Sequence, residues 1–125
     1  MGHVASRHSD TMLRAYIEAA LWSTTDESTP DGGEPLDKNY GPEDIAQATL
    51  EAMRHDVTAF AETYAEQLEG SWDRAGLDLW LTRNGLGAGF WDGDWPEPAA
   101  TVLTDAAEAL GEFCLYVGNN GELCS

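Results

Sequence analysis

The stretch from Leu77 to Trp95, LDLWLTRNGLGAGFWDGDW, constrains the fold more than any other part of this chain. Leu77, Leu79 and Leu81 alternate with other residues, which predicts a β-strand because successive side chains of a strand point to opposite faces. The following NGLG sequence supplies glycines that tolerate positive φ, and residues 88–95 can return as a second strand. The sequence therefore predicts an antiparallel hairpin that holds three of the five tryptophans.

Helical periodicity predicts the elements on either side of this hairpin. Apolar residues recur every third or fourth position in residues 11–22, 42–70 and 99–110, which is the spacing of one face of an α-helix. Pro42 is typical of a first helical turn, and Gly111 is typical of the position just after a helix. Two short strands, 113–117 and 122–124, flank the turn sequence NNG.

These elements predict a single α+β domain of residues 1–125, in which three helices pack on a small antiparallel sheet in the order α-α-β-β-α-β-β. A chain of this length can bury one hydrophobic core but not two. Residues 1–8 are expected to be disordered and residues 23–41 to form a long acidic loop. The expected core comprises Leu50, Met53, Val57, Phe60, Tyr64, Leu79 and Leu81.

The charge balance is strongly acidic, with 23 acidic against 6 basic residues and a net charge of -17. Such a field repels nucleic acid and anionic membranes, and it favours basic partners. The same composition is typical of halophile proteins and high-GC genomes, and acid can also serve solubility alone. The N-terminus lacks an apolar segment, and no stretch approaches the ~20 apolar residues of a membrane span. We therefore expect a cytoplasmic protein without membrane contacts.

The sequence shows no persuasive catalytic or metal-binding set. The residues typical of such sites are scattered: His3, His8, His55, Cys114 and Cys124. Neither cysteine belongs to a CxxC pair. A bridge between Cys114 and Cys124 is an alternative, but a single pair in a non-secreted chain is more often two free thiols, which we expect here. The acids of the 23–41 loop do not fit the spacing of a calcium-binding EF-hand. The GxGxG sequence at 85–89 lies between two predicted strands, where a phosphate-binding loop would need a helix to follow. We therefore predict no enzyme, metal or cofactor.

Residues 78–92, DLWLTRNGLGAGFWD, resemble a motif of small phage- and prophage-encoded acidic proteins of uncharacterised function. In those proteins FWLTRNGHGAGFWD precedes a helix and a terminal hairpin with a sequence similar to LYVGDDG. Residues 115–121, LYVGNNG, look like this hairpin, and residues 16–23 and 36–40 resemble the opening of the family. Leu86 stands where the family usually has histidine, and Gly93 where arginine is common. The resemblance implies a phage accessory protein with counter-defence work, and it implies no enzyme.

Charge and resemblance together predict a protein that presents acid in place of nucleic-acid phosphate. Duplex DNA carries one charge per about 1.7 Å of its axis, and the proteins that bind it are lined with lysine and arginine. The expected partner is a basic nucleic-acid-binding host protein, with a CRISPR effector, a restriction enzyme or a uracil-DNA glycosylase as candidates. The chain itself is not expected to bind nucleic acid. The predicted partner-binding residues are Glu62, Glu66, Glu69, Asp73, Asp78, Trp80, Trp91, Asp92 and Asp94.

Three points stay open in the sequence. The alternative function is a phage interaction or structural module that is acidic only for solubility, and the oligomeric state is undetermined. Arg83 is expected to bridge to Asp92 or Asp94, although it could also bind the carboxylate of a ligand.

Overall fold

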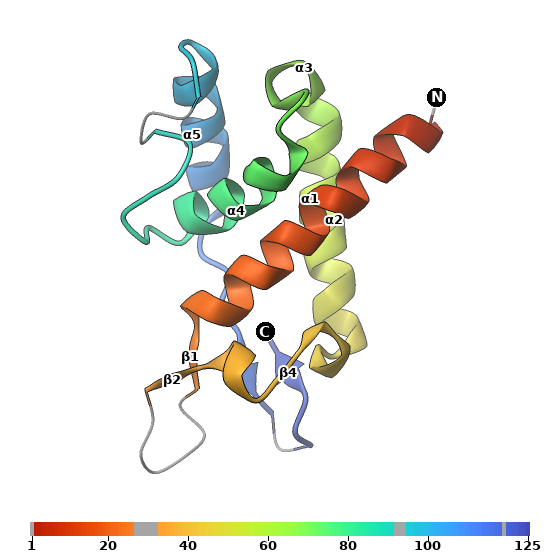
Figure 1. Cartoon of the computed structure of the whole chain (residues 1–125), viewed down its shortest axis with the longest axis vertical. Coiled ribbons are helices and arrows are strands. Elements are labelled where there is room, and N and C mark those ends of the chain that lie inside the picture. Colours follow the sequence, from red (N-terminus) through yellow and green to blue (C-terminus); the bar gives the residue numbers. More distant parts are fainter. Residues whose placement is uncertain (1, 27–32, 92–94, 119) are drawn as a thin grey trace.

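The computed structural model describes residues 2–26, 33–91, 95–118 and 120–125, with side chains described from residue 8 onward. Its elements are α1 (Gly2–Ser23), β1 (Thr25–Asp26), β2 (Glu34–Pro35), η1 (Leu36–Lys38), η2 (Pro42–Asp44), α2 (Gln47–Thr63), α3 (Ala65–Leu68), α4 (Trp72–Arg83), α5 (Ala99–Leu110), β3 (Tyr116–Val117) and β4 (Leu123–Cys124). The helix α1 crosses in front of α2 and packs on α4, while the strands lie at the opposite end of the molecule from α3 (Figure 1). The α+β character is confirmed, but most of the described chain is helical.

The predicted strand at 77–83 is wrong, because residues 72–83 form the helix α4. All but one of the residues from Ala75 to Arg83 are buried, and Leu77 is half-buried. A helix that is buried on every side has no polar face, so its hydrophobic period does not distinguish it from a strand. The four-stranded sheet is therefore replaced, within the described residues, by two separate two-stranded ladders.

The predicted hairpin turn is instead the C-terminal cap of α4. Gly85 has a φ of 63°, and the Leu86 amide donates a hydrogen bond to the Leu81 carbonyl at 3.0 Å. This six-to-one bond is typical of a helix that ends with a left-handed glycine. The Asn-Gly pair thus supplies the same backbone conformation that a hairpin would need, but it ends a helix here.

The helix α4 lies against α1 at Gly76. A Cβ atom at this position would overlap the carbonyl oxygen of Met12 and come within 2.8 Å of the Tyr16 amide nitrogen. The absence of a side chain therefore allows the two helix backbones to approach closely. This contact places the whole 72–83 segment at the centre of the fold.

The predicted helix at 42–70 is divided into the short turn η2 and the helices α2 and α3. Ile45 forms a parallel bridge with Leu123, and the amide of Ala46 donates to the Leu123 carbonyl at 2.9 Å. This pairing with β4 delays the start of the long helix until Gln47. Tyr64 separates α2 from α3 with a φ of -114°.

The core prediction is largely confirmed. Met53, Val57, Phe60, Leu79 and Leu81 are buried, whereas Leu50 and Tyr64 are half-buried and pack against the core. The side chains of Phe60 and Phe90 stack at 5.8 Å between ring centroids. The remaining large side chains of the core come chiefly from α1, namely Met12, Leu13, Tyr16, Ile17 and Leu21.

The two ends of the chain differ in how well they were predicted. The first helix begins at Gly2, so the backbone of residues 2–10 is helical where disorder or a later start was expected. In the acidic loop, Thr25 pairs with Pro35 and Asp26 with Glu34 in an antiparallel ladder, and residues 27–32 lie outside the described residues. The helix α5 has the predicted bounds, and β3 pairs with β4 as the predicted terminal hairpin.

No described helix combines the length and apolar character of a membrane span.

Candidate partner-binding surface

Three side chains of α4 turn inward and join this helix to other segments: Asp78, Trp80 and Arg83. The Trp95 Nε1 atom donates to a carboxylate oxygen of Asp78 at 2.6 Å. The Trp80 Nε1 atom donates to the Ser23 hydroxyl at 2.7 Å. Asp78 and Trp80 are 3% and 2% exposed, so the prediction that they contact a partner is wrong. Burial of these groups is acceptable because each has a hydrogen-bond partner.

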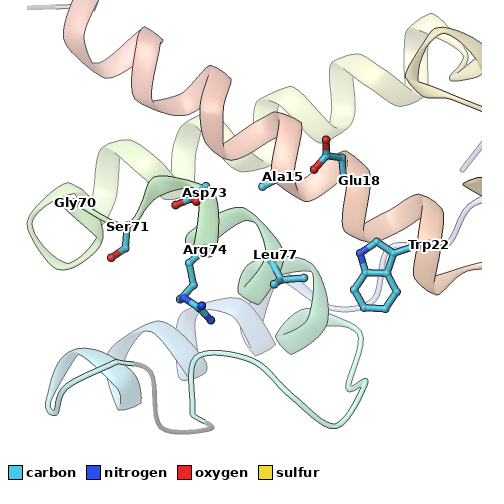
Figure 2. A pocket seen from close by; sticks show the side chains of 8 residues that line it. All are labelled: Ala15, Glu18, Trp22, Gly70, Ser71, Asp73, Arg74 and Leu77. Atoms are coloured by element: carbon cyan, nitrogen blue, oxygen red, sulfur yellow. The ribbon is translucent and has the colours of Figure 1, made fainter.

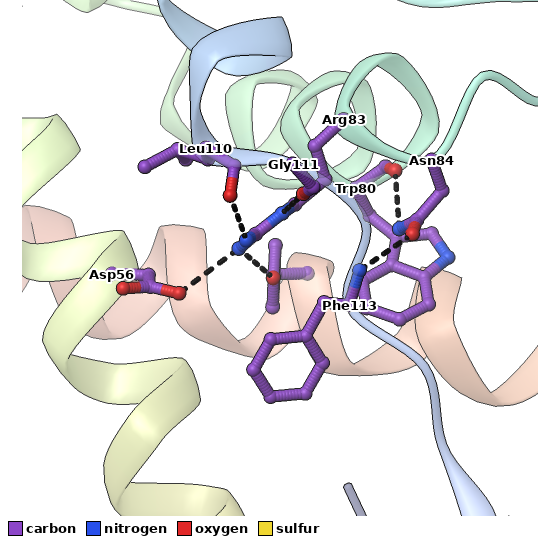
Figure 3. Close-up of polar contacts among 8 residues, drawn as sticks. Asp56, Trp80, Arg83, Asn84, Leu110, Gly111 and Phe113 are labelled. Carbon is purple, nitrogen blue, oxygen red and sulfur yellow. Dashed lines mark hydrogen bonds and ion pairs between the residues drawn. The ribbon is translucent and has the colours of Figure 1, made fainter.

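Arg83 is the most highly connected of these residues (Figure 3). Its Nη1 atom lies 3.0 Å from a carboxylate oxygen of Asp56 and donates to the Tyr16 hydroxyl, also at 3.0 Å. Its Nε and Nη2 atoms donate to the carbonyl oxygens of Gly111 and Leu110, at 2.7 and 3.2 Å. Within the described residues, the ion pair of Arg83 is with Asp56 on α2. The aspartates predicted to pair with Arg83, Asp92 and Asp94, lie outside the described residues.

Asn84 and Phe113 extend this network to the C-terminal segment. The Asn84 side chain accepts a hydrogen bond from the Phe113 amide at 2.8 Å and donates to the Trp80 carbonyl at 3.0 Å. The Phe113 ring lies 5.3 Å from the Arg83 guanidinium carbon, within the range of a cation–π contact. The residues of the 78–92 motif from Asp78 to Asn84 thus hold α1, α2, α5 and the C-terminal segment together. They serve the fold and are not available to a partner.

Burial raises the pKa of the Tyr16 hydroxyl to about 12, and the Arg83 charge only partly opposes this shift. The unfolded chain has the ordinary value of 10.0, so the contribution of Tyr16 to stability is complete below pH 10 and is lost as the pH rises towards 12. We expect the free energy of unfolding to fall by about 2–3 kcal/mol over this range. Denaturant unfolding at a series of pH values would measure the slope, and Tyr16→Phe should remove it. An equal slope in the variant would contradict the assignment.

The exposed acids of the predicted surface lie on consecutive elements. Glu62 is on α2, Glu66 on α3, Glu69 in the following turn and Asp73 in the first turn of α4, and all four are exposed. Asp92 and Asp94 lie outside the described residues. We define the acidic surface as Glu62, Glu66, Glu69 and Asp73.

Cations border the acidic surface but do not cover it. Arg54 and Glu62 line the same shallow depression on α2, and Arg74 follows Asp73 along α4. Two other basic side chains already form ion pairs. Arg83 is buried and pairs with Asp56, and Lys38 pairs with Glu34 at 2.6 Å.

Two tryptophans are exposed, one at a position that the sequence did not identify as surface and one at a predicted partner-binding position. Trp22 is 48% exposed and lines a groove of about 350 Å³ between α1 and α4 (Figure 2). Glu18, Arg74 and Leu77 line the same groove, which therefore carries both signs of charge. Trp91 is 53% exposed, as its predicted partner-binding role requires.

The described residues contain no group of three histidine, cysteine or acidic side chains that could hold a metal ion. Cys114 is exposed and Cys124 is half-buried, and both are free thiols.

Comparisons of the chain with protein-family models, curated proteins and solved structures find no match. What the surface offers chemically is a set of carboxylates on a helical frame, with exposed aromatic side chains elsewhere.

Proposed function

We propose that this chain is a phage-type accessory protein that acts as an acidic nucleic-acid mimic and inhibits a host nucleic-acid-handling or defence protein. The observation that carries the proposal is the acidic surface, whose four exposed carboxylates lie on α2, on α3, in the turn after α3 and on α4. The network around Arg83 supports it, because it joins α4, which presents Asp73, to α2, which presents Glu62. The resemblance of residues 78–92 to phage-encoded proteins supplies the biological context.

The physical basis of the proposal is competition for a basic groove. A protein that binds DNA neutralises phosphates with lysine and arginine, and it releases counterions when it does so. Carboxylates held on a folded scaffold can occupy the same groove, and a net charge of -17 accelerates the encounter. The same charge keeps the chain away from nucleic acid itself.

Charge reversal on the acidic surface tests the proposal. Replacing Glu62, Glu66 and Glu69 together with lysine is expected to weaken binding to the basic target by about 2–3 kcal/mol at low salt, since each reversed charge opposes a cation. Because all three side chains are exposed, the fold should remain intact. A competition experiment would measure the effect. The protein would displace labelled DNA from each candidate target, namely a CRISPR effector, a restriction enzyme and a uracil-DNA glycosylase, and fluorescence anisotropy would report the DNA that stays bound.

The matched control reverses three exposed acids on other elements, Asp37, Glu43 and Glu122. It changes the net charge equally, but these residues lie on η1, on η2 and beside β4, at the end of the molecule away from α3 (Figure 1). Equal losses for both triple variants would show that total charge acts without a defined surface. A wild-type protein that displaces DNA from none of the candidate targets at low salt would refute the mimic.

The exposed Trp91 favours the alternative, an interaction module whose acid serves only solubility. Tryptophan is a frequent anchor of protein interfaces. On this alternative, Trp91→Ala would abolish binding of a partner while reversal of the acidic surface would leave it unchanged.

A further inference from the structure

The helix α5 carries two apolar faces, and only one of them is needed for the core. Ala100, Leu103 and Ala107 are buried. A second stripe at helical spacing consists of Val102, Ala106, Ala109 and Leu110, of which Ala106 is half-buried and the others are exposed. Val102 and Leu110 are among the few large apolar residues exposed on the described surface. The second stripe has no partner within the described chain that covers it.

Three of the four residues of this second stripe line a groove of about 310 Å³ between α2 and α5. Ala106, Ala109 and Leu110 line the α5 side, while Ala59, Phe60 and Tyr64 line the α2 side. We call it the α2–α5 groove. Its volume lies near the lower limit of small-molecule pockets, so it suits a few apolar side chains better than a whole cofactor.

One end of the α2–α5 groove is held by the Arg83 network. Asp56 also lines the groove, and it binds Arg83, which in turn binds the carbonyl oxygen of Leu110 on the opposite wall. Figure 3 shows the guanidinium between these two residues. The spacing of α2 and α5 is therefore set by part-buried, charge-assisted bonds, and the groove exists before any ligand arrives.

The rims of the α2–α5 groove carry acid. Glu62 lies one turn after Ala59 on α2, and Asp105 directly precedes Ala106 on α5; both side chains are exposed. A helix turns 100° per residue, which places both acids beside the groove-lining residues on the solvent side. No lysine or arginine lines the groove among the described residues. The groove thus presents an apolar floor between two anionic edges.

We propose that the α2–α5 groove binds an amphipathic basic helix of the partner. A groove between two helices accepts apolar side chains that repeat at one-turn intervals, which is the usual mode of helix recognition in a groove. Lysines or arginines beside the apolar stripe of such a helix would meet Glu62 and Asp105. The inference deepens the proposed function, on which it rests for the identity of the partner as a basic protein, and it adds an apolar anchor that charge alone does not supply.

A pair of synthetic peptides tests the groove without any knowledge of the natural target. One peptide is built from leucine and lysine so that the leucines form one face of a helix, and the other has the same composition in scrambled order. Isothermal titration at physiological salt is expected to give at least about tenfold tighter binding of the amphipathic peptide. Equal affinities would show attraction by charge alone and would overturn the proposal, as would no binding of either peptide.

Filling the groove locates the binding site. Ala109→Trp is expected to weaken binding of the amphipathic peptide by about tenfold or more, because the indole would occupy the space of the peptide side chains. Ala109 is exposed, so the fold should tolerate the change. The matched control is Ala48→Trp, at an exposed position on α2 that precedes the groove by two turns. Equal effects of both variants, or none, would place the peptide elsewhere.

The peptide experiment and the DNA-competition experiment fail independently. Peptide binding that is lost in Ala109→Trp, together with no displacement of DNA from any candidate target, would remove the nucleic-acid mimic and leave the groove. Displacement of DNA that Ala109→Trp leaves unchanged, with no preference for the amphipathic peptide, would keep the mimic and remove the groove.

Discussion

Replacing Gly76 with alanine is expected to lower the free energy of unfolding by about 3 kcal/mol or more. The added methyl group would overlap the Met12 carbonyl and approach the Tyr16 amide to 2.8 Å. Both atoms belong to the backbone of α1, so they cannot move without separating α1 from α4. Urea unfolding followed by circular dichroism would measure the loss.

The expected loss of stability at Gly76 is opposite in sign to the usual effect of this substitution in a helix. Glycine-to-alanine exchange within a helix ordinarily stabilises it by about 1 kcal/mol. The reverse exchange Ala52→Gly, at an exposed position on α2, should therefore cost about 1 kcal/mol and reports propensity alone. If Gly76→Ala stabilised the protein, the close approach of α1 and α4 would be wrong.

Replacing Arg83 with alanine is expected to cost about 3–5 kcal/mol. The change leaves the Asp56 carboxylate without its cation, and it leaves the Tyr16 hydroxyl and two carbonyl oxygens at the end of α5 without a donor. Lysine should not rescue the loss, because one ammonium group cannot reproduce the planar fork of donors. Chemical denaturation of both variants would check these expectations.

The control for Arg83 is Arg54→Ala, which removes an exposed arginine and should change stability by less than about 0.5 kcal/mol. A double-mutant cycle with Asp56→Ala isolates the ion pair. We expect the double variant to lose less free energy of unfolding than the sum of the two single losses, since the Asp56 carboxylate destabilises the fold only when Arg83 no longer pairs with it. Additive losses would show that the pair is not coupled.

These two predictions separate the fold from the surface. Variants at Gly76 and Arg83 should destabilise the protein, and any loss of partner binding would follow from that. Variants at Glu62, Glu66 or Ala109 change exposed side chains, so they should alter binding at unchanged stability. Stability measurements are therefore needed beside every binding measurement.

The amino-acid sequence by itself determined the elements whose signals are local. The helix α5 has its predicted bounds because prolines precede it and Gly111, with a φ of 78°, ends it. The terminal hairpin follows from its Asn-Gly turn. Met53, Val57 and Phe60 are buried as predicted, since their spacing leaves one apolar face on α2. The exposure of Glu62 and Glu66 follows from the same periodicity.

Only the tertiary structure decided the state of residues 72–83. Alternating leucines fit a strand or a buried helix, and Asn84-Gly85 fits a hairpin turn or a helix cap, so local chemistry does not choose between them. The choice depends on contacts between residues far apart in sequence: Trp80 with Ser23, Arg83 with Tyr16, and Gly76 with the backbone of α1. These contacts turn Asp78 and Trp80 inward and Arg83 towards Asp56. The α2–α5 groove has the same origin, because a cavity between two helices is a property of their packing and not of either helix alone.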